Sequence, residues 1–103
     1  MTTSNPKFRQ TLHNVLVVLF ETSEGGITIS LSPATSWRPD MFLSKSGRQF
    51  WGQIDFGSIV YPGTTSEGKL RASYPEDLSM SLKSGEEIEL KFGVALLGTA
   101  TIL

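Results

Sequence analysis

The side chains that most often carry catalytic chemistry are scarce in this sequence. It contains no cysteine and one histidine, His13, which lies inside the most apolar segment of the chain. The lack of cysteine excludes thiolate nucleophiles, disulfides and thiolate metal sites, and one histidine supplies too few nitrogen ligands for zinc. A serine nucleophile would need His13 as its base in a core-like position, so a structural histidine is the simpler interpretation. We therefore expect no metal site and no cofactor.

Carboxylates are the second group with chemical potential. They occur as Glu76–Asp77 and as Glu86, Glu87 and Glu89. Paired carboxylates hydrolyse glycosides only when a groove holds them at a fixed separation, and a solvated turn and strand face explain these residues more simply. The pair Gly25–Gly26 lacks the third glycine and the helix of a dinucleotide-binding fingerprint. The chain is predicted to be non-enzymatic and to bind no nucleotide, with a small carboxylate hydrolase as one alternative.

Residues suited to a binding surface are concentrated in one segment. Its aromatic and basic members are Trp37, Arg38, Phe42, Arg48 and Trp51. Tryptophan and arginine are enriched where binding energy is concentrated in protein interfaces. Aromatic residues also fill the cores of small β-proteins, so either tryptophan can be core or surface. These five residues are the predicted partner-binding site.

The elements that must position these residues are strands. Apolar and polar residues alternate with period two, and short clusters of Gly, Pro, Asp and Ser interrupt the pattern. Alternation is clearest in 27–31, 78–82 and 88–92; further strands are expected at 12–20, 41–44, 50–56, 69–73 and 94–102. Segment 12–20 is apolar almost throughout, which predicts a strand covered on both faces, and 57–68 is a candidate long loop. The pattern predicts an all-β fold of many short strands, either a barrel or a sandwich.

Length and composition limit the remaining possibilities. The 103 residues suffice for one domain, with 1–10 as a disordered or loosely attached tail and 11–103 as the folded β-domain. The longest apolar run, 15–20, is too short to cross a bilayer, so no membrane partner is expected. Net charge is −1, which disfavours nucleic acid as the main partner. The absence of cysteine favours a reducing compartment, and a cytoplasmic location is the expectation.

The order of motifs along the chain resembles the third, C-terminal β-barrel domain of the elongation factor Tu family. The segments that carry the resemblance are 12–26, Trp37–Phe42, Trp51–Phe56, Tyr74–Asp77, 88–92 and 93–102 with Gly98. The resemblance implies a single closed or partly open antiparallel β-barrel of six or seven strands, as a stand-alone chain. In the family this barrel contacts the T stem of aminoacyl-tRNA, an exchange factor and the GTPase domain. Arg38, in the matching Arg-Pro motif, is the residue carried over, supported by Trp37 and Phe42.

The sequence also departs from the family pattern. It has no phosphate-binding loop, 57–66 looks inserted, Glu76 replaces a turn glycine, and Ala95 stands where the family has arginine. The leading hypothesis is accordingly a barrel that binds a protein partner without turnover. A special case is a small bacterial immunity protein that neutralises a toxin by covering its active site. The alternative is an RNA- or tRNA-associated translation module, whose binding would weaken with salt and on neutralising Arg38, Lys45 or Arg48.

Overall fold

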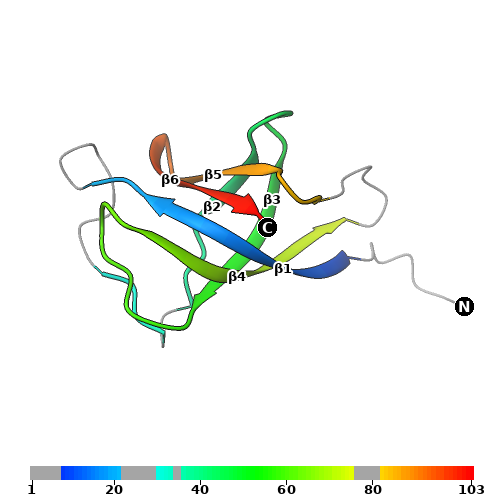
Figure 1. Ribbon diagram of the computed structural model, residues 1–103. Coiled ribbons are helices and arrows are strands. Elements are labelled where there is room, and N and C mark those ends of the chain that lie inside the picture. Colours follow the sequence, from blue (N-terminus) through cyan, green and yellow to red (C-terminus); the bar gives the residue numbers. More distant parts are fainter. Residues whose placement is uncertain (1–7, 22–29, 34–35, 76–81) are drawn as a thin grey trace, which may run out of the picture.

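The chain folds into a closed, six-stranded antiparallel β-barrel (Figure 1). The computed structural model describes residues 8–21, 30–33, 36–75 and 82–103. Its strands are β1 (Phe8–Leu19), β2 (Asp40–Leu43), β3 (Gln49–Phe56), β4 (Thr65–Pro75), β5 (Glu87–Phe92) and β6 (Ala95–Ile102). These residues form no helix, and within them nothing helical is long and apolar enough to span a bilayer.

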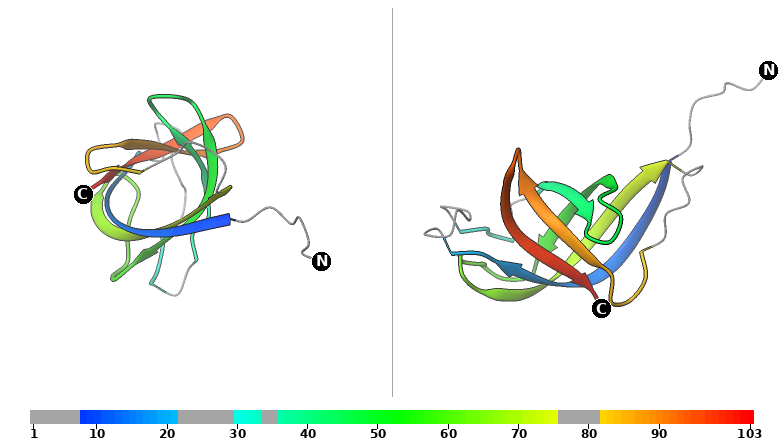
Figure 2. Two further views of the ribbon diagram at one scale, coloured as in Figure 1. Left: turned by 90° about the vertical axis from the view of Figure 1, so that its right-hand side faces the viewer. Right: turned by 90° about the horizontal axis from the view of Figure 1, so that it is seen from above.

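The strands follow the order β1-β4-β3-β2-β5-β6, and pairing of β6 with β1 closes the barrel. Seen along the barrel in the left view of Figure 2, the strands surround a common interior. Every pairing is antiparallel. The predicted all-β barrel is thus confirmed, with six strands. This architecture is compatible with the fold of the elongation factor Tu third domain.

The barrel interior is a single apolar core, so only one face of β1 is buried. Val15, Val17 and Leu19 are buried, whereas Leu12 and Val18 on the other face are 61% and 38% exposed. The prediction that this segment is covered on both faces was therefore wrong. A closed barrel has one interior, so alternate residues of each strand face outward even where they are apolar.

Two strands are longer than their apolar patterns predicted. β1 begins at Phe8, within the segment expected to be a tail, because β4 pairs with it from Phe8↔Pro75 to Val18↔Thr65. The right view of Figure 2 shows the start of β1 and the end of β4 extending side by side from the barrel. Cross-strand hydrogen bonds continue a strand through polar residues that show no apolar period.

The predicted long loop and two of the predicted strands have mixed outcomes. The last four residues of the 57–68 segment belong to β4, and Val60 in its middle is buried and forms an isolated bridge with Leu31. Most of the predicted strands 27–31 and 78–82 lies outside the described residues. Of their described members, Leu31 and Leu82 are both buried.

The seam between β1 and β6 depends on a glycine. Gly98 pairs with Leu19 on one side and with Leu90 of β5 on the other. A Cβ atom at this position would collide with the backbone carbonyl oxygen of Val18. The backbones of β1 and β6 therefore approach too closely for any side chain at position 98.

Candidate partner-binding face

The outer surface of β3 presents the most exposed tryptophan described. Phe50, Ile54 and Phe56 point into the core, while Trp51 on the opposite face is 58% exposed. Strand alternation places Gln53 on the same outer face as Trp51. One strand thus contributes to the core and displays an aromatic surface.

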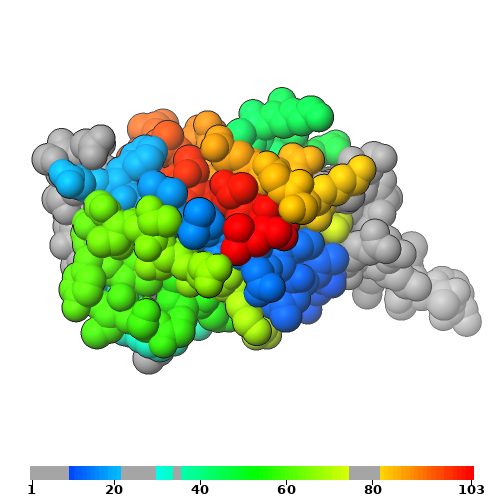
Figure 3. Space-filling model, viewed as in Figure 1, coloured from blue at the N-terminus to red at the C-terminus, as the bar shows by residue number. Residues whose placement is uncertain are grey.

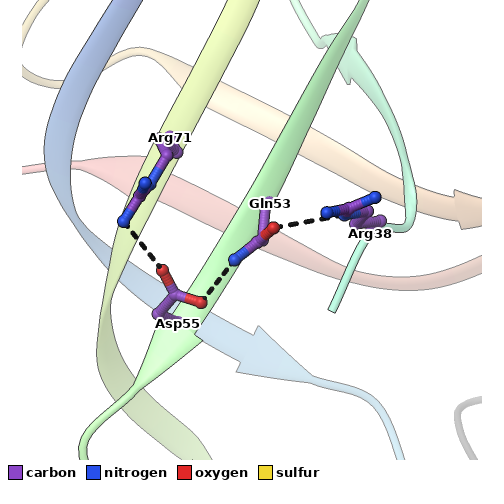
Figure 4. Close-up of polar contacts among 4 residues, drawn as sticks. All are labelled: Arg38, Gln53, Asp55 and Arg71. Atoms are coloured by element: carbon purple, nitrogen blue, oxygen red, sulfur yellow. Dashed lines mark hydrogen bonds and ion pairs between the residues drawn. The ribbon is translucent and has the colours of Figure 1, made fainter. Parts of the chain in front are cut away.

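Four polar side chains form a continuous row of contacts on the outside of the barrel (Figure 4). Arg38 Nε donates a hydrogen bond to Gln53 Oε1 at 3.1 Å, and Gln53 Nε2 donates to Asp55 Oδ1 at 2.8 Å. Arg71 Nη2 lies 3.8 Å from Asp55 Oδ2. Gln53 pairs with Arg71 in the β3–β4 register, so cross-strand geometry brings these groups together. We call Arg38, Trp51, Gln53, Asp55 and Arg71 the Arg38–Trp51 face.

A depression of about 330 Å³ lies in this face. Its lining combines an indole, two guanidinium groups, amides, hydroxyl and carboxylate: Gln10, Arg38, Pro39, Asp40, Gln49, Phe50, Trp51, Gly52, Gln53, Arg71 and Ser73. A mixed lining of this kind suits a peptide or protein surface, because it offers one large apolar contact surrounded by hydrogen-bonding groups.

A second depression, of about 610 Å³, shares Asp55 with the row and extends towards β1. Asn14, Glu67, Lys69 and Leu103 contribute to its lining. Figure 3 looks onto the surface where β1, β4 and β6 lie side by side. This depression contains none of the five predicted partner-binding residues.

The two tryptophans have different environments. Trp37 is half-buried against the core, with its ring centroid 6.2 Å from that of Phe56. Its carbonyl oxygen accepts a hydrogen bond from Ile54 N at 2.8 Å. This backbone bridge places the next residue, Arg38, beside Gln53. Trp37 therefore positions Arg38 and supports the core, whereas Trp51 lies on the outer face with 58% of its surface exposed.

The structure places the other two predicted residues outside the depression. Phe42 is half-buried on β2, and Lys91 Nζ lies 5.1 Å from its ring centroid. Arg48 is exposed after the turn between β2 and β3, where its backbone N–H donates to Ser46 Oγ at 3.3 Å. Of the five predicted residues, Arg38 and Trp51 line one depression.

Sequence reasoning missed three members of the face. Alternation within the predicted strand 50–56 placed Gln53 and Asp55 on the same side as Trp51, and this signal was available from the sequence. Arg71 joins them only through the β3–β4 register. No local pattern in the sequence indicates that pairing.

The predicted acidic group is engaged in ordinary surface contacts. Glu87 Oε1 accepts a hydrogen bond from Ser44 Oγ at 3.0 Å, and Glu89 Oε1 lies 3.6 Å from Lys91 Nζ. The other acidic pair, in 76–81, lies outside the described residues. In the ranges that the structure describes, no three His, Cys, Asp or Glu residues are grouped so as to hold a metal ion.

His13 is half-buried in β1, and its Nε2 shares a hydrogen bond with Thr11 Oγ1 at 2.8 Å. Burial lowers the pKa of His13 below its usual value of 6.5 by removing water from the charged form. As the pH falls below 6.5, the unfolded chain therefore binds a proton at His13 more readily than the native protein does. We expect the His13 contribution to the free energy of unfolding to be complete above pH 6.5 and to be lost below it.

The His13→Gln variant isolates this contribution, because glutamine retains a hydrogen-bonding group but does not titrate. Urea denaturation should be measured for both proteins at several pH values on either side of the His13 transition. The wild type should lose more stability on acidification than the variant. Identical pH profiles would show that protonation of His13 is not coupled to folding.

No protein-family model matches this chain, and no curated protein matches it significantly. The resemblance to the elongation factor Tu third domain consequently stands on the sequence motifs and on a compatible barrel architecture.

Proposed function

We propose that this chain is a non-catalytic binding module that engages a protein partner through the Arg38–Trp51 face. The observation that carries the proposal is the exposure of Trp51, at 58%, on a strand held on both sides by its neighbours. Such an indole buries a large area on binding and loses little conformational entropy, because the strand already holds it in place. Arg38 lines the same depression and supplies directional donors.

The charges of the face favour protein over RNA. Arg38 and Arg71 share the depression with Asp40, and Asp55 lies 3.8 Å from Arg71. A phosphate backbone is bound by surfaces with a net positive charge, because affinity grows with the number of phosphates neutralised. The balanced face supports a protein partner. A toxin whose active site is covered by this face is the special case that an immunity protein would represent.

The RNA-associated alternative draws its support from the resemblance and from the position of Arg38 in the matching Arg-Pro motif. It predicts recovery of tRNA that falls steeply as salt rises. The proposed protein interface predicts a complex with much weaker salt dependence, since burial of Trp51 contributes apolar contact that ions do not screen. Salt dependence therefore separates the two functions.

The test is affinity capture from a lysate of the native host at low and high salt, with mass spectrometry for proteins and sequencing for RNA. Wild type is compared with Trp51→Ala, Arg38→Gln and the control Arg48→Gln, which removes an equivalent exposed charge outside the depression. We expect a stoichiometric protein partner that survives high salt, is lost with Trp51→Ala and Arg38→Gln, and is kept with the control. Trp37 is left intact because its substitution would disturb the core.

The captured partner is then purified and titrated against each variant. Trp51→Ala should weaken its affinity about 30-fold, which corresponds to roughly 2 kcal/mol for a central interface tryptophan. A partner retained at full affinity by a variant with both Trp51→Ala and Arg38→Gln would contradict the proposed site. Recovery of tRNA alone, at low salt alone, would replace the proposal with the RNA-associated alternative.

A further inference from the structure

Among the described residues, Arg38 is the cation of the Arg38–Trp51 face that forms no ion pair. Arg71 lies 3.8 Å from the Asp55 carboxylate, so each partly offsets the other. Arg38 instead donates its Nε hydrogen to the neutral amide of Gln53. In the described part of the chain, the ion pairs are Arg71–Asp55 and Lys91–Glu89, and neither includes Arg38.

The hydrogen bond to Gln53 also orients the Arg38 guanidinium. Gln53 is itself held by Asp55, so the acceptor for Arg38 Nε is fixed on β3. One N–H of the planar group is used, and no other hydrogen bond from Arg38 is formed to a described residue. The terminal nitrogens retain the paired N–H geometry that matches a carboxylate. Arg38 is therefore preorganised to receive an anionic oxygen pair.

The surroundings limit how much negative charge a ligand can bring. Asp40 also lines the depression, and Asp55 lies beside it in the polar row. These carboxylates repel a ligand with closely spaced negative charges, while Arg38 attracts a single one. Trp51 on the same depression favours an apolar or aromatic group next to that charge.

We infer that the partner segment bound by this face carries a carboxylate adjacent to a large apolar side chain. The carboxylate pairs with the Arg38 guanidinium, and the apolar side chain covers the Trp51 indole. The inference rests on the proposed function, since it names the chemistry of the partner at the same face. The carboxylate is an Asp or Glu side chain within the partner segment, and a C-terminal carboxylate is the competing source that the test separates from it.

The inference is tested on the full chain with four pools of synthetic peptides. The pools share one design, in which fixed central positions are flanked by randomised positions. Three have an amidated C-terminus and contain Glu, Gln or Lys next to Leu. The fourth has no acidic side chain and ends in Leu with a free carboxylate. Binding is followed by NMR shifts of the Trp37 and Trp51 indole N–H groups, since the half-buried Trp37 serves as an internal reference.

We expect the Glu peptides to shift the Trp51 signal, with affinity on the order of 1 mM. A shift with the free-carboxylate peptides alone would overturn the assignment to an Asp or Glu side chain. The Gln peptides should bind at least about tenfold more weakly, because the charge-assisted hydrogen bonds are lost. Arg38→Gln should abolish the difference between Glu and Gln peptides, whereas Arg48→Gln should preserve it. The peptide class that binds identifies the source of the carboxylate.

Equal binding of Glu, Gln and Lys peptides would overturn the inference, as would the absence of any shift at Trp51. Neither result alters the proposed function if partner capture still depends on Trp51. Conversely, capture that survives Trp51→Ala and Arg38→Gln contradicts the proposed function, whatever the peptides do. The two experiments therefore fail independently.

Discussion

Replacing Gly98 with alanine is expected to lower the free energy of unfolding by about 3 kcal/mol or more, the upper range for an overpacked interior site. The added methyl group would collide with the carbonyl oxygen of Val18, which belongs to the neighbouring strand β1. Backbone cannot rotate away as a flexible side chain can, so β6 must move from β1. The seam that closes the barrel would open, and the effect should reach the whole cooperative unit.

Gly57→Ala is the matched control for this substitution. Apart from Gly57 itself and its two chain neighbours, no described residue has an atom within 4 Å of a Cβ at this position, and the φ angle of Gly57 is not positive. Its effect should stay within about 0.5 kcal/mol, as for most surface substitutions. Urea denaturation followed by circular dichroism compares the two variants. If Gly98→Ala were as stable as Gly57→Ala, the close approach of β1 and β6 would not exist in solution.

Phe50→Ala is expected to cost about 3–5 kcal/mol of stability, as for other buried aromatic truncations. Phe50 is 1% exposed and is the largest fully buried side chain among the residues that the structure describes. Its removal leaves a cavity in the barrel centre, because the paired strands on both sides restrict collapse. Thermal and denaturant unfolding measure this loss directly.

The adjacent substitution Trp51→Ala should behave in the opposite way. It removes a still larger side chain, yet the outer face of β3 leaves no cavity behind. We expect a stability change within about 0.5 kcal/mol together with the loss of partner binding. A destabilisation equal to that of Phe50→Ala would make Trp51 a structural residue and remove the apolar anchor of the proposed interface.

The contrast between these neighbours has a functional consequence. Because inward and outward residues alternate along β3, the barrel core holds the strand in place while its outer side chains remain available for contact. Substitutions on the outer face can then change partner specificity without loss of the fold. A rigid strand also reduces the conformational entropy that binding must overcome.

Part of the fold follows from local patterns. Alternation at 88–92 correctly predicted β5, and the turn residues after Leu43 correctly separated β2 from β3. These features depend on neighbours in the chain. The start of β1 at Phe8 depends instead on pairing with Pro75 of β4, and no apolar period marks it. The end of a strand cannot be predicted from a single sequence when it depends on pairing with a strand far away in the chain.

The candidate site also combines residues that the sequence identifies with residues that only strand pairing brings together. Residue types alone identified Arg38 and Trp51, because tryptophan and arginine suit interfaces wherever they are exposed. The amino-acid sequence does not indicate which of Trp37 and Trp51 packs against the core. That difference depends on the backbone bridge between Trp37 and Ile54, which places the Trp37 ring near Phe56. Asp55 and Arg71 likewise meet only after β3 and β4 pair.

The amino-acid sequence by itself determined that this protein is an all-β domain with one apolar core, since period-two alternation and turn residues act over a few positions. Tertiary structure alone decided that one face of the uniformly apolar β1 lies outside the barrel, that the barrel closes, and which charges meet. Those outcomes depend on cross-strand register, in which residues far apart in the chain become neighbours about 5 Å apart. That register also leaves Arg38, held by neutral Gln53 beside the exposed Trp51, as the cation available to a partner.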